Sequence, residues 1–303
     1  PVTDFGRELY VPWRLAEGAL LYRDADDFYG PLSQYVNAGL FRALGPGLTV
    51  LVGANLVVFA AIVGVLYFLV RRGWGATAAV AAPAVFIAVF GFSRFLYSGN
   101  CTYAAPYSHE TTHGMLLTLA LVATLVRWLR HPGVGLSALA GFLFGLLWVL
   151  KPEFILAGGA AVGVAFVLHL RAGTRWRPAA WIAALAFAVL PSLSFWIFFA
   201  RHVDAPTALG YAGKAWLSVV ATTRYVADPA QARYTGFDQP GVNAANQLIG
   251  GAVALAAAAI TFAMGRWLDR NTTTGRRTVL GAVAVVGVAS ASWYAGRDFW
   301  IES

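Results

Sequence analysis

Hydrophobic residues gather in eight long runs that are separated by short polar connectors. The runs lie near residues 48–70, 76–97, 113–128, 134–150, 153–170, 179–200, 246–265 and 279–296. Each has about the length, roughly 17–25 residues, that an α-helix needs to cross a bilayer. The pattern therefore predicts an all-α, polytopic transmembrane protein with eight spans.

Charge divides the connectors into two alternating sets. Those at 71–75, 127–133, 171–178 and 266–278 carry many arginines and a single acid, Asp269. Positive residues concentrate in cytoplasmic loops, so these four connectors are predicted to face the cytoplasm. All other carboxylates then lie on the outer side, and six of them precede the first run. We expect a multi-pass protein of a bacterial inner membrane whose active face is periplasmic or extracellular.

The outer segments define the expected organisation. Residues 1–47 form a leader in which apolar positions within 9–21 and 32–44 follow helical spacing, with an acidic turn at 22–31 between them. Such patterns are typical of amphipathic helices at a membrane surface. Residues 48–200 hold six spans, 201–245 a second large outer loop, and 246–303 two further spans and an outer tail. Because an outward leader needs a preceding span or signal, we expect a helix before residue 1, and the chain to be a fragment.

Composition excludes several classes of protein. Hydrophobic residues make up 59% of the chain, charged residues 12%, and the mean hydropathy is +0.64, all far from soluble base rates. The net charge of +8 arises largely in the cytoplasmic connectors, so it does not indicate nucleic-acid binding. A single cysteine, Cys101, excludes an intrachain disulfide framework.

Several short segments of the outer loops belong together as a pattern. They are residues 4–8 (DFGRE), 10–12 (YVP), 17–24 (EGALLYRD), 29–32 (YGPL), 106–110 (PYSHE), 113–114 (HG) and 151–153 (KPE). This set resembles bacterial family 39-like C-type glycosyltransferases, relatives of protein O-mannosyltransferases and aminoarabinose transferases. Residues 28–30 (FYG) depart from the charged residues that aminoarabinose transferases carry before the Pro-Leu pair.

The resemblance implies a C-type glycosyltransferase fold and transfer of a sugar from a polyprenyl-phosphate carrier to a glycan, lipid or protein acceptor. It places Asp4 at the position of the family's general base. An acceptor hydroxyl that attacks an anomeric carbon must lose its proton to a nearby carboxylate. Glu8, one helical turn later, would support Asp4 or replace it. Capping of the first helix is the alternative role for Asp4.

The leaving lipid phosphate needs nearby cations and hydrogen-bond donors. Lys151 stands where a predicted span emerges, and its alternative role is to extend toward the lipid headgroups. The candidate residues for donor-phosphate and substrate binding are Arg7, Asp24, Tyr29, His109, Glu110, Lys151, Glu153 and Arg201.

Residues 109–113 (HETTH) match the H-E-x-x-H pattern, in which two histidines one helical turn apart share a zinc ion. The motif supports an alternative function as an integral membrane zinc metalloprotease. Within a transferase, a divalent metal ion held by His109, Glu110 and His113 is also left open.

A secondary transporter is the less favoured class. Transporters carry charged residues and broken helices near the middle of the membrane. The predicted spans contain almost no charged residues. Arg94 is the nearest exception, and it lies near a span end. The charges instead gather at one surface, as sugar transfer from a lipid carrier requires.

Overall fold

The computed structural model describes residues 3–91, 102–106, 108–173, 178–222, 238–246, 248–250 and 252. Within this part the chain is helical, without a β-sheet. It separates into two compact units, one of residues 1–65 and 91–220 and the other of 66–90 and 221–303. All the residues that form the site described below belong to the first unit.

Four helices in the described part are long and apolar enough to cross a membrane: α3 (Leu48–Phe86), α4 (His109–Arg130), α6 (Pro152–Arg171) and α7 (Pro178–Ala200). Helix α5 (Val134–Trp148) is apolar but shorter. The described part confirms the predicted all-α fold, and the length and composition of these four helices support a membrane protein. The predicted runs at 279–296 and most of 246–265 lie outside the described residues, as do residues 92–97 of the second run.

The predicted connector at 71–75 coincides with a kink inside α3. Helical structure runs from Leu48 to Phe86 as two helices that meet at Gly75, whose φ of 88° and ψ of −176° are non-helical. Glycine adopts this backbone conformation without the steric penalty that a Cβ atom brings. A π-helical turn, Ile87–Gly91, then follows α3.

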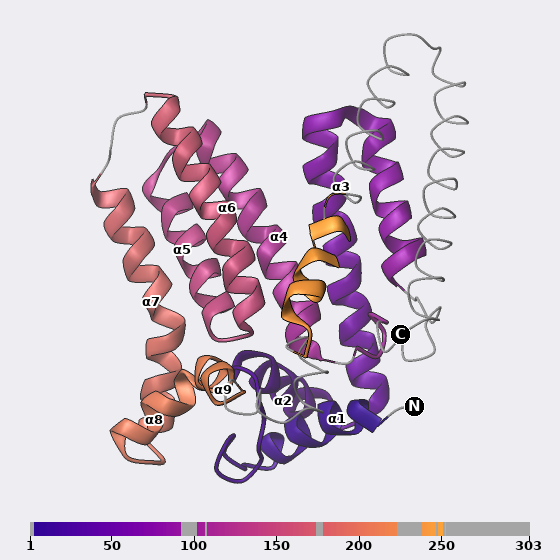
Figure 1. The fold of residues 1–303 in the computed structure, drawn as a ribbon. Helices are drawn as coiled ribbons and strands as arrows, with labels where there is room; N and C mark the ends of the chain where they lie inside the picture. Colours follow the sequence, from indigo (N-terminus) through magenta and orange to yellow (C-terminus); the bar gives the residue numbers. More distant parts are fainter. Residues whose placement is uncertain are drawn as a thin grey trace. The chain divides into compact units, whose positions relative to one another are not determined.

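Helices α5 and α7 pack with their backbones close together. A Cβ atom at Gly141 or Gly145 would collide with the backbone carbonyls of Ala184 and Ala188. Small residues spaced by four let two membrane helices approach until their backbones touch. Helices α4 to α7 of this unit run alongside one another (Figure 1).

The leader forms two helices, α1 (Thr3–Ala16) and α2 (Leu32–Leu44). Helix α2 coincides with the predicted stretch at 32–44, whereas α1 begins and ends earlier than the apolar spacing within 9–21 indicates. The chain turns after Ala16 because Gly18 has φ 103°. Both helices lie across one end of the helices that follow (Figure 1).

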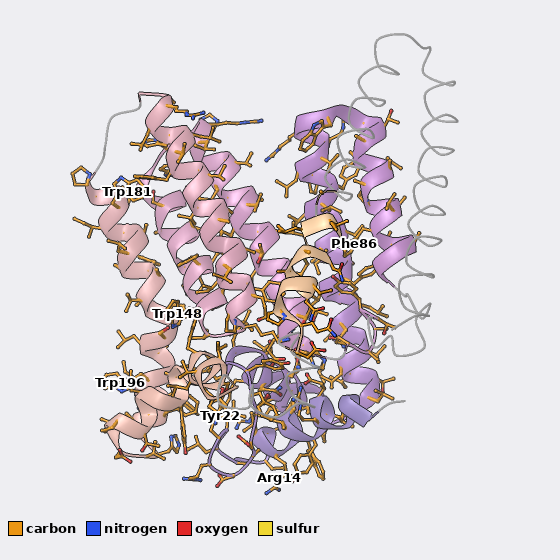
Figure 2. The ribbon with its side chains drawn as sticks, in the orientation of Figure 1. Arg14, Tyr22, Phe86, Trp148, Trp181 and Trp196 are labelled. Atoms are coloured by element: carbon orange, nitrogen blue, oxygen red, sulfur yellow. The ribbon has the colours of Figure 1, made fainter. Side chains whose placement is uncertain are left out.

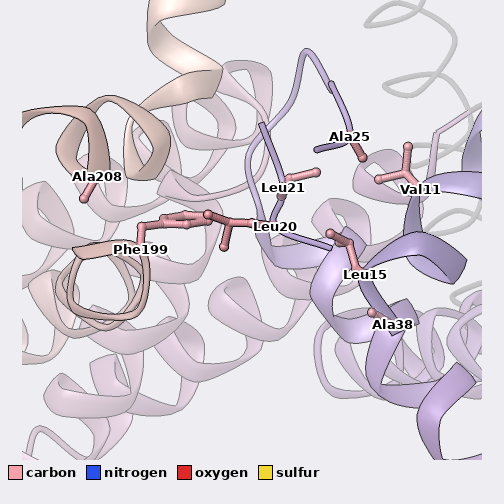
Figure 3. Packing of buried hydrophobic residues seen from close by; sticks show 8 residues of the cluster. All are labelled: Val11, Leu15, Leu20, Leu21, Ala25, Ala38, Phe199 and Ala208. Atoms are coloured by element: carbon pink, nitrogen blue, oxygen red, sulfur yellow. The ribbon is translucent and has the colours of Figure 1, made fainter. Parts of the chain in front are cut away.

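The leader packs against the end of α7 and against α8 (Ala205–Ala212) through an apolar cluster. Leu15, Leu20 and Leu21 of the leader pack in it with Phe199, and none of them is more than 3% exposed (Figure 3). Tyr22 lies at this end of the unit, as does Trp148 at the end of α5, whereas Trp181 lies at the other end (Figure 2). The last helix of the unit, α9 (Lys214–Thr222), brings Trp216 into a stack on Trp148, with ring centroids 4.6 Å apart.

Candidate functional site

Polar side chains that are far apart in sequence meet where the leader covers the beginnings of α3, α4 and α6. We call this set the buried polar cluster. Its members are Arg7 and Glu8 of α1, Asp27 and Tyr29 of the loop, Ser33 and Gln34 of α2, Asn55 of α3, Ser108, His109, Glu110 and His113 at the start of α4, and Lys151 before α6.

Glu8 and His109 form the centre of the cluster, and both are 0% exposed. One oxygen of Glu8, Oε2, accepts hydrogen bonds from the backbone N–H of His109 at 3.1 Å and from its Nδ1 at 2.6 Å. The other, Oε1, accepts from Arg7 Nη2 at 2.9 Å. With the proton on Nδ1, His109 Nε2 accepts from Asn55 Nδ2 at 3.2 Å.

These contacts determine the acidity of Glu8. Burial acts to raise the pKa of Glu8, but hydrogen bonds from His109 and Arg7 outweigh it and lower that pKa below its ordinary value. Glu8 is therefore an ionised carboxylate whose two oxygens are both engaged. It suits the role of holding His109 and Arg7 in place better than the role of accepting a proton.

Two further contacts join α2 to the start of α4. Glu110 accepts hydrogen bonds from Ser108 Oγ at 2.7 Å and from Gln34 Nε2 at 3.2 Å. His113 Nδ1 lies 2.9 Å from Ser33 Oγ. Because Gln34 and Ser33 are both fully buried, these bonds satisfy polar groups that have no access to water.

Asp27 belongs to the cluster, although the sequence analysis placed it only in the acidic turn at 22–31. Its Oδ1 stabilises the loop, since it accepts hydrogen bonds from the backbone N–H groups of Phe28 at 2.6 Å and Tyr29 at 3.3 Å. The side chain is nevertheless only 2% exposed. Burial raises the pKa of Asp27, and the charge of Arg7 opposes this effect.

The loop after Asp27 also brings Lys151 into the cluster. Gly30 N–H donates to the carbonyl of Leu150 at 2.8 Å, and Leu32 N–H to that of Val149 at 3.3 Å. A Cβ atom at Gly30 would collide with the Val149 carbonyl, so this approach requires glycine. Lys151 Nζ consequently lies 3.9 Å from the centroid of the Tyr29 ring.

The structure brings together six of the ten residues predicted for catalysis and for donor or substrate binding: Arg7, Glu8, Tyr29, His109, Glu110 and Lys151. Asp24 stabilises the turn in which it lies, because it accepts hydrogen bonds from Leu20 N–H at 2.8 Å and from Arg23. The hydrogen bonds from Arg23 lower the pKa of Asp24 to about 2. Glu153 and Arg201 are exposed and have no side-chain bond to the cluster within the described part. The side chain of Asp4 lies outside the described residues.

The two histidines of the H-E-x-x-H motif lie one turn apart, with ring centroids 6.2 Å from each other. Their Nδ1 atoms face Glu8 and Ser33. Over the described ranges, no group of three or more His, Cys, Asp or Glu side chains is placed to hold a metal ion.

Sequence reasoning missed Asp27, Ser33, Gln34 and Asn55. Asn55 carried a usable signal, because an amide inside an apolar run is costly in a membrane unless it has a partner. Gln34 and Ser33 fall on the buried face of an amphipathic helix, where a polar residue implies a hydrogen bond. Asp27 gave no such signal, since acids are common in turns.

Comparison with known proteins adds no family assignment. No family model matches the chain, and neither a curated protein nor a solved structure matches it.

Proposed function

We propose that the chain is a membrane glycosyltransferase. It transfers a sugar from a polyprenyl-phosphate donor to an acceptor at the outer face, with inversion at the anomeric carbon. Asp4 is the general base, as the resemblance to family 39-like transferases implies. Glu8 and His109 hold the start of α1 against α4, and Lys151 with Arg7 binds the phosphate of the carrier.

The surroundings of the Lys151 side chain give this proposal its main support. The side chain is 8% exposed, and within the described part its ammonium has one hydrogen-bond acceptor, Thr111 Oγ1 at 3.4 Å. No carboxylate oxygen of the side chains that the structure describes, which exclude that of Asp4, lies within 4 Å of it. A buried cation without an anionic partner carries a large desolvation penalty. A phosphate oxygen would supply the missing charge and hydrogen bonds.

The alternative role for Lys151, extension toward the headgroups, accounts for this environment less well. An extending lysine keeps its ammonium in water or among headgroups. Here the ammonium is folded back over the Tyr29 ring at 3.9 Å. Arg7 approaches the same ring, with its Cζ 5.6 Å from the centroid. Two cations beside one aromatic ring of the leader support an anion site there.

The metalloprotease is the second candidate, and the geometry around His109 favours it less. A zinc ligand must offer a free ring nitrogen lone pair. Nδ1 of His109 faces Glu8 at 2.6 Å, and Nε2 faces the Asn55 amide at 3.2 Å. The histidine is thus used in hydrogen bonds that stabilise the cluster.

The test is sugar release from radiolabelled polyprenyl-phosphate-sugar donors in membranes that contain the wild type, Asp4→Asn, Lys151→Gln, Lys151→Arg or His113→Ala. We expect turnover in the wild type, loss in Asp4→Asn, and a drop of about 100-fold in Lys151→Gln, comparable to the loss of one transition-state donor. Lys151→Arg should retain part of the activity. Absence of turnover, together with zinc-dependent proteolysis that His113→Ala abolishes, would support the protease instead.

A further inference from the structure

Tyr22, at the start of the acidic turn at 22–31, has a strained backbone. Its φ is 70°, and in the part of the chain that the structure describes it is the one residue other than glycine with a positive φ. Residues with a Cβ atom rarely adopt this conformation, because the Cβ atom crowds the following carbonyl oxygen. A bulky residue keeps it only where its surroundings determine it, and such positions gather at functional sites. The contacts of the Tyr22 side chain must therefore compensate for the strain.

The backbone and the ring of Tyr22 are both held in place. The backbone N–H donates to the carbonyl of Ala25 at 2.7 Å, which closes a short turn. The ring lies against Phe199 of α7 and Tyr211 of α8, with ring centroids 6.0 Å and 5.4 Å away. Nζ of Lys214, the first residue of α9, is 5.6 Å from the centroid of the Tyr22 ring. The ring is thus anchored on the end of α7 and on the two helices that follow it.

The hydroxyl of Tyr22 reaches across the turn to a residue of the buried polar cluster. It donates to the backbone carbonyl of Tyr29 at 2.6 Å. Burial raises the pKa of Tyr22 well above its ordinary value, so the hydroxyl keeps its proton and remains a donor. A short hydrogen bond from an anchored ring fixes the Tyr29 backbone relative to α7 and α8.

The ring of Tyr29 is in turn the surface against which Lys151 lies. Nζ of Lys151 is 3.9 Å from the ring centroid, a distance at which an ammonium is attracted to the face of the ring. Its hydrogen bond to Thr111 Oγ1 is long, at 3.4 Å. A flexible side chain with one weak hydrogen bond takes its position from the surface on which it packs. A movement of Tyr29 is therefore transmitted to the ammonium of Lys151.

We infer that Tyr22 is a positioning residue, whose hydroxyl holds Tyr29 and, through it, holds Lys151 where the carrier phosphate binds. The phosphate-binding role of Lys151 rests on the proposed function, whereas the placement of this lysine by Tyr22 does not. The strained backbone lets the Tyr22 ring pack on α7 and α8 while its hydroxyl meets the Tyr29 carbonyl. The contacts connect α8 and α9 to Lys151 through the two tyrosines.

The placement of Lys151 can be measured without a ligand, because Lys151 and Lys214 are the two lysines of the sequence. Purified protein in nanodiscs is treated with sulfosuccinimidyl acetate, and mass spectrometry follows the acetylation of each lysine with time. In the wild type, Lys151, which is 8% exposed, should react more slowly than Lys214, whose side chain is 33% exposed. Tyr22→Phe removes the hydroxyl and keeps the ring. It should speed acetylation of Lys151 by about threefold to tenfold, the effect of one lost hydrogen bond, and leave Lys214 unchanged.

Tyr35→Phe is the matched control, because it removes a hydroxyl from another ring that lies against Phe199. The Tyr35 hydroxyl accepts a hydrogen bond from Leu21 N–H at 3.3 Å. Both acetylation rates in this variant should match those of the wild type. An unchanged rate for Lys151 in Tyr22→Phe would overturn the inference. So would an equal rise for both lysines, which would indicate a general loosening of the structure.

Titration with farnesyl phosphate, which carries the phosphate on a short prenyl chain, extends the test to binding. Tyr22→Phe should weaken binding about threefold to tenfold. It should cause no further loss in a Lys151→Gln background, because the hydroxyl acts through that lysine. A loss of the same size in both backgrounds would assign Tyr22 a structural role and overturn the inference. If the wild type did not bind farnesyl phosphate while acetylation changed as expected, the proposed phosphate site would be wrong and the placement of Lys151 by Tyr22 would be confirmed.

Discussion

Glu8 and Asp27 are two buried carboxylates of the leader with opposite shifts in acidity. Glu8 accepts hydrogen bonds from Arg7 and His109, which lower its pKa despite burial. Asp27 has hydrogen bonds on one oxygen only, and burial raises its pKa. A buried charge with all its hydrogen bonds made stabilises a fold, whereas one with an unpaired oxygen is costly. The contacts of Glu8 support a positioning role, and those of Asp27 hold the backbone of the loop at Phe28 and Tyr29.

Glu8→Gln should destabilise the protein by about 2–3 kcal/mol at pH 7, because Arg7 loses its partner and His109 its acceptor charge. A lowered pKa means that the ionised form stabilises the fold. The contribution of Glu8 is therefore complete above about pH 4.3, the ordinary value for glutamate, and disappears as the pH falls through the lowered pKa. Thermal unfolding from pH 3 to 7 should show the gap between wild type and variant closing in acid.

Glu17→Gln is the matched control, since Glu17 pairs with Arg14 at 2.8 Å where both side chains are at least 40% exposed. Exposed pairs contribute little, so this variant should unfold within about 0.5 kcal/mol of the wild type. A gap for Glu8→Gln that is absent at pH 7, or equally large at every pH, would contradict the role of the Glu8 charge.

The sequence predicted many members of the cluster but few of the contacts between them. Arg7, Glu8, His109, Glu110 and Lys151 were candidates because of the family resemblance and because sugar transfer from a lipid phosphate needs a base and nearby cations. Their pairings join positions such as 8 and 109, which no local pattern relates. The partners of Asp27 and Gln34 depend on the same long-range contacts, so the sequence did not predict them.

Among the helices and loops, one contact does most to position the cluster. It joins the leader loop to the chain between α5 and α6. Gly30 donates to Leu150 and lies against Val149, which directs Lys151 toward Tyr29. Helix spans were predictable because hydropathy is local, and α2 followed its amphipathic pattern. The early end of α1 depended on the positive φ of Gly18, which apolar spacing does not report, whereas the kink at Gly75 falls inside the predicted connector at 71–75.

Gly30→Ala should separate the leader from this loop. The new Cβ atom collides with a backbone carbonyl that cannot rotate away, so we expect a loss of about 1–3 kcal/mol. Binding of farnesyl phosphate, a short polyprenyl phosphate, should weaken as well, because Lys151 loses its position beside Tyr29. Thermal unfolding measures the first effect, and titration of the purified protein with farnesyl phosphate measures the second.

Gly39→Ala on α2 provides the comparison, because a Cβ atom there meets nothing within 4 Å. Alanine in a helix should stabilise it by about 0.5–1 kcal/mol. If Gly30→Ala behaved like Gly39→Ala, the docking of the leader on this loop would not position the site.

The whole molecule is predicted to have one orientation, with the leader outside and the arginine-rich connectors inside. Labelling of single cysteines in a Cys101→Ser background tests this orientation. Asp26→Cys in the leader should react with a membrane-impermeant maleimide in intact cells. His131→Cys, at an exposed position after α4, should react only after the membrane is permeabilised. The reverse pattern would place the buried polar cluster in the cytoplasm and exclude an outer-face transferase.

Transfer by the wild-type protein in proteoliposomes can be followed through both products of the reaction. The donors are polyprenyl-phosphate sugars with label in the sugar, supplied with a membrane extract as the source of acceptor. An inverting transferase should release polyprenyl phosphate in step with labelled acceptor, and the linkage formed should have the anomeric configuration opposite to that of the donor. Donors that remain intact across the series, while a protein substrate is cleaved in the presence of zinc, would contradict the proposed function.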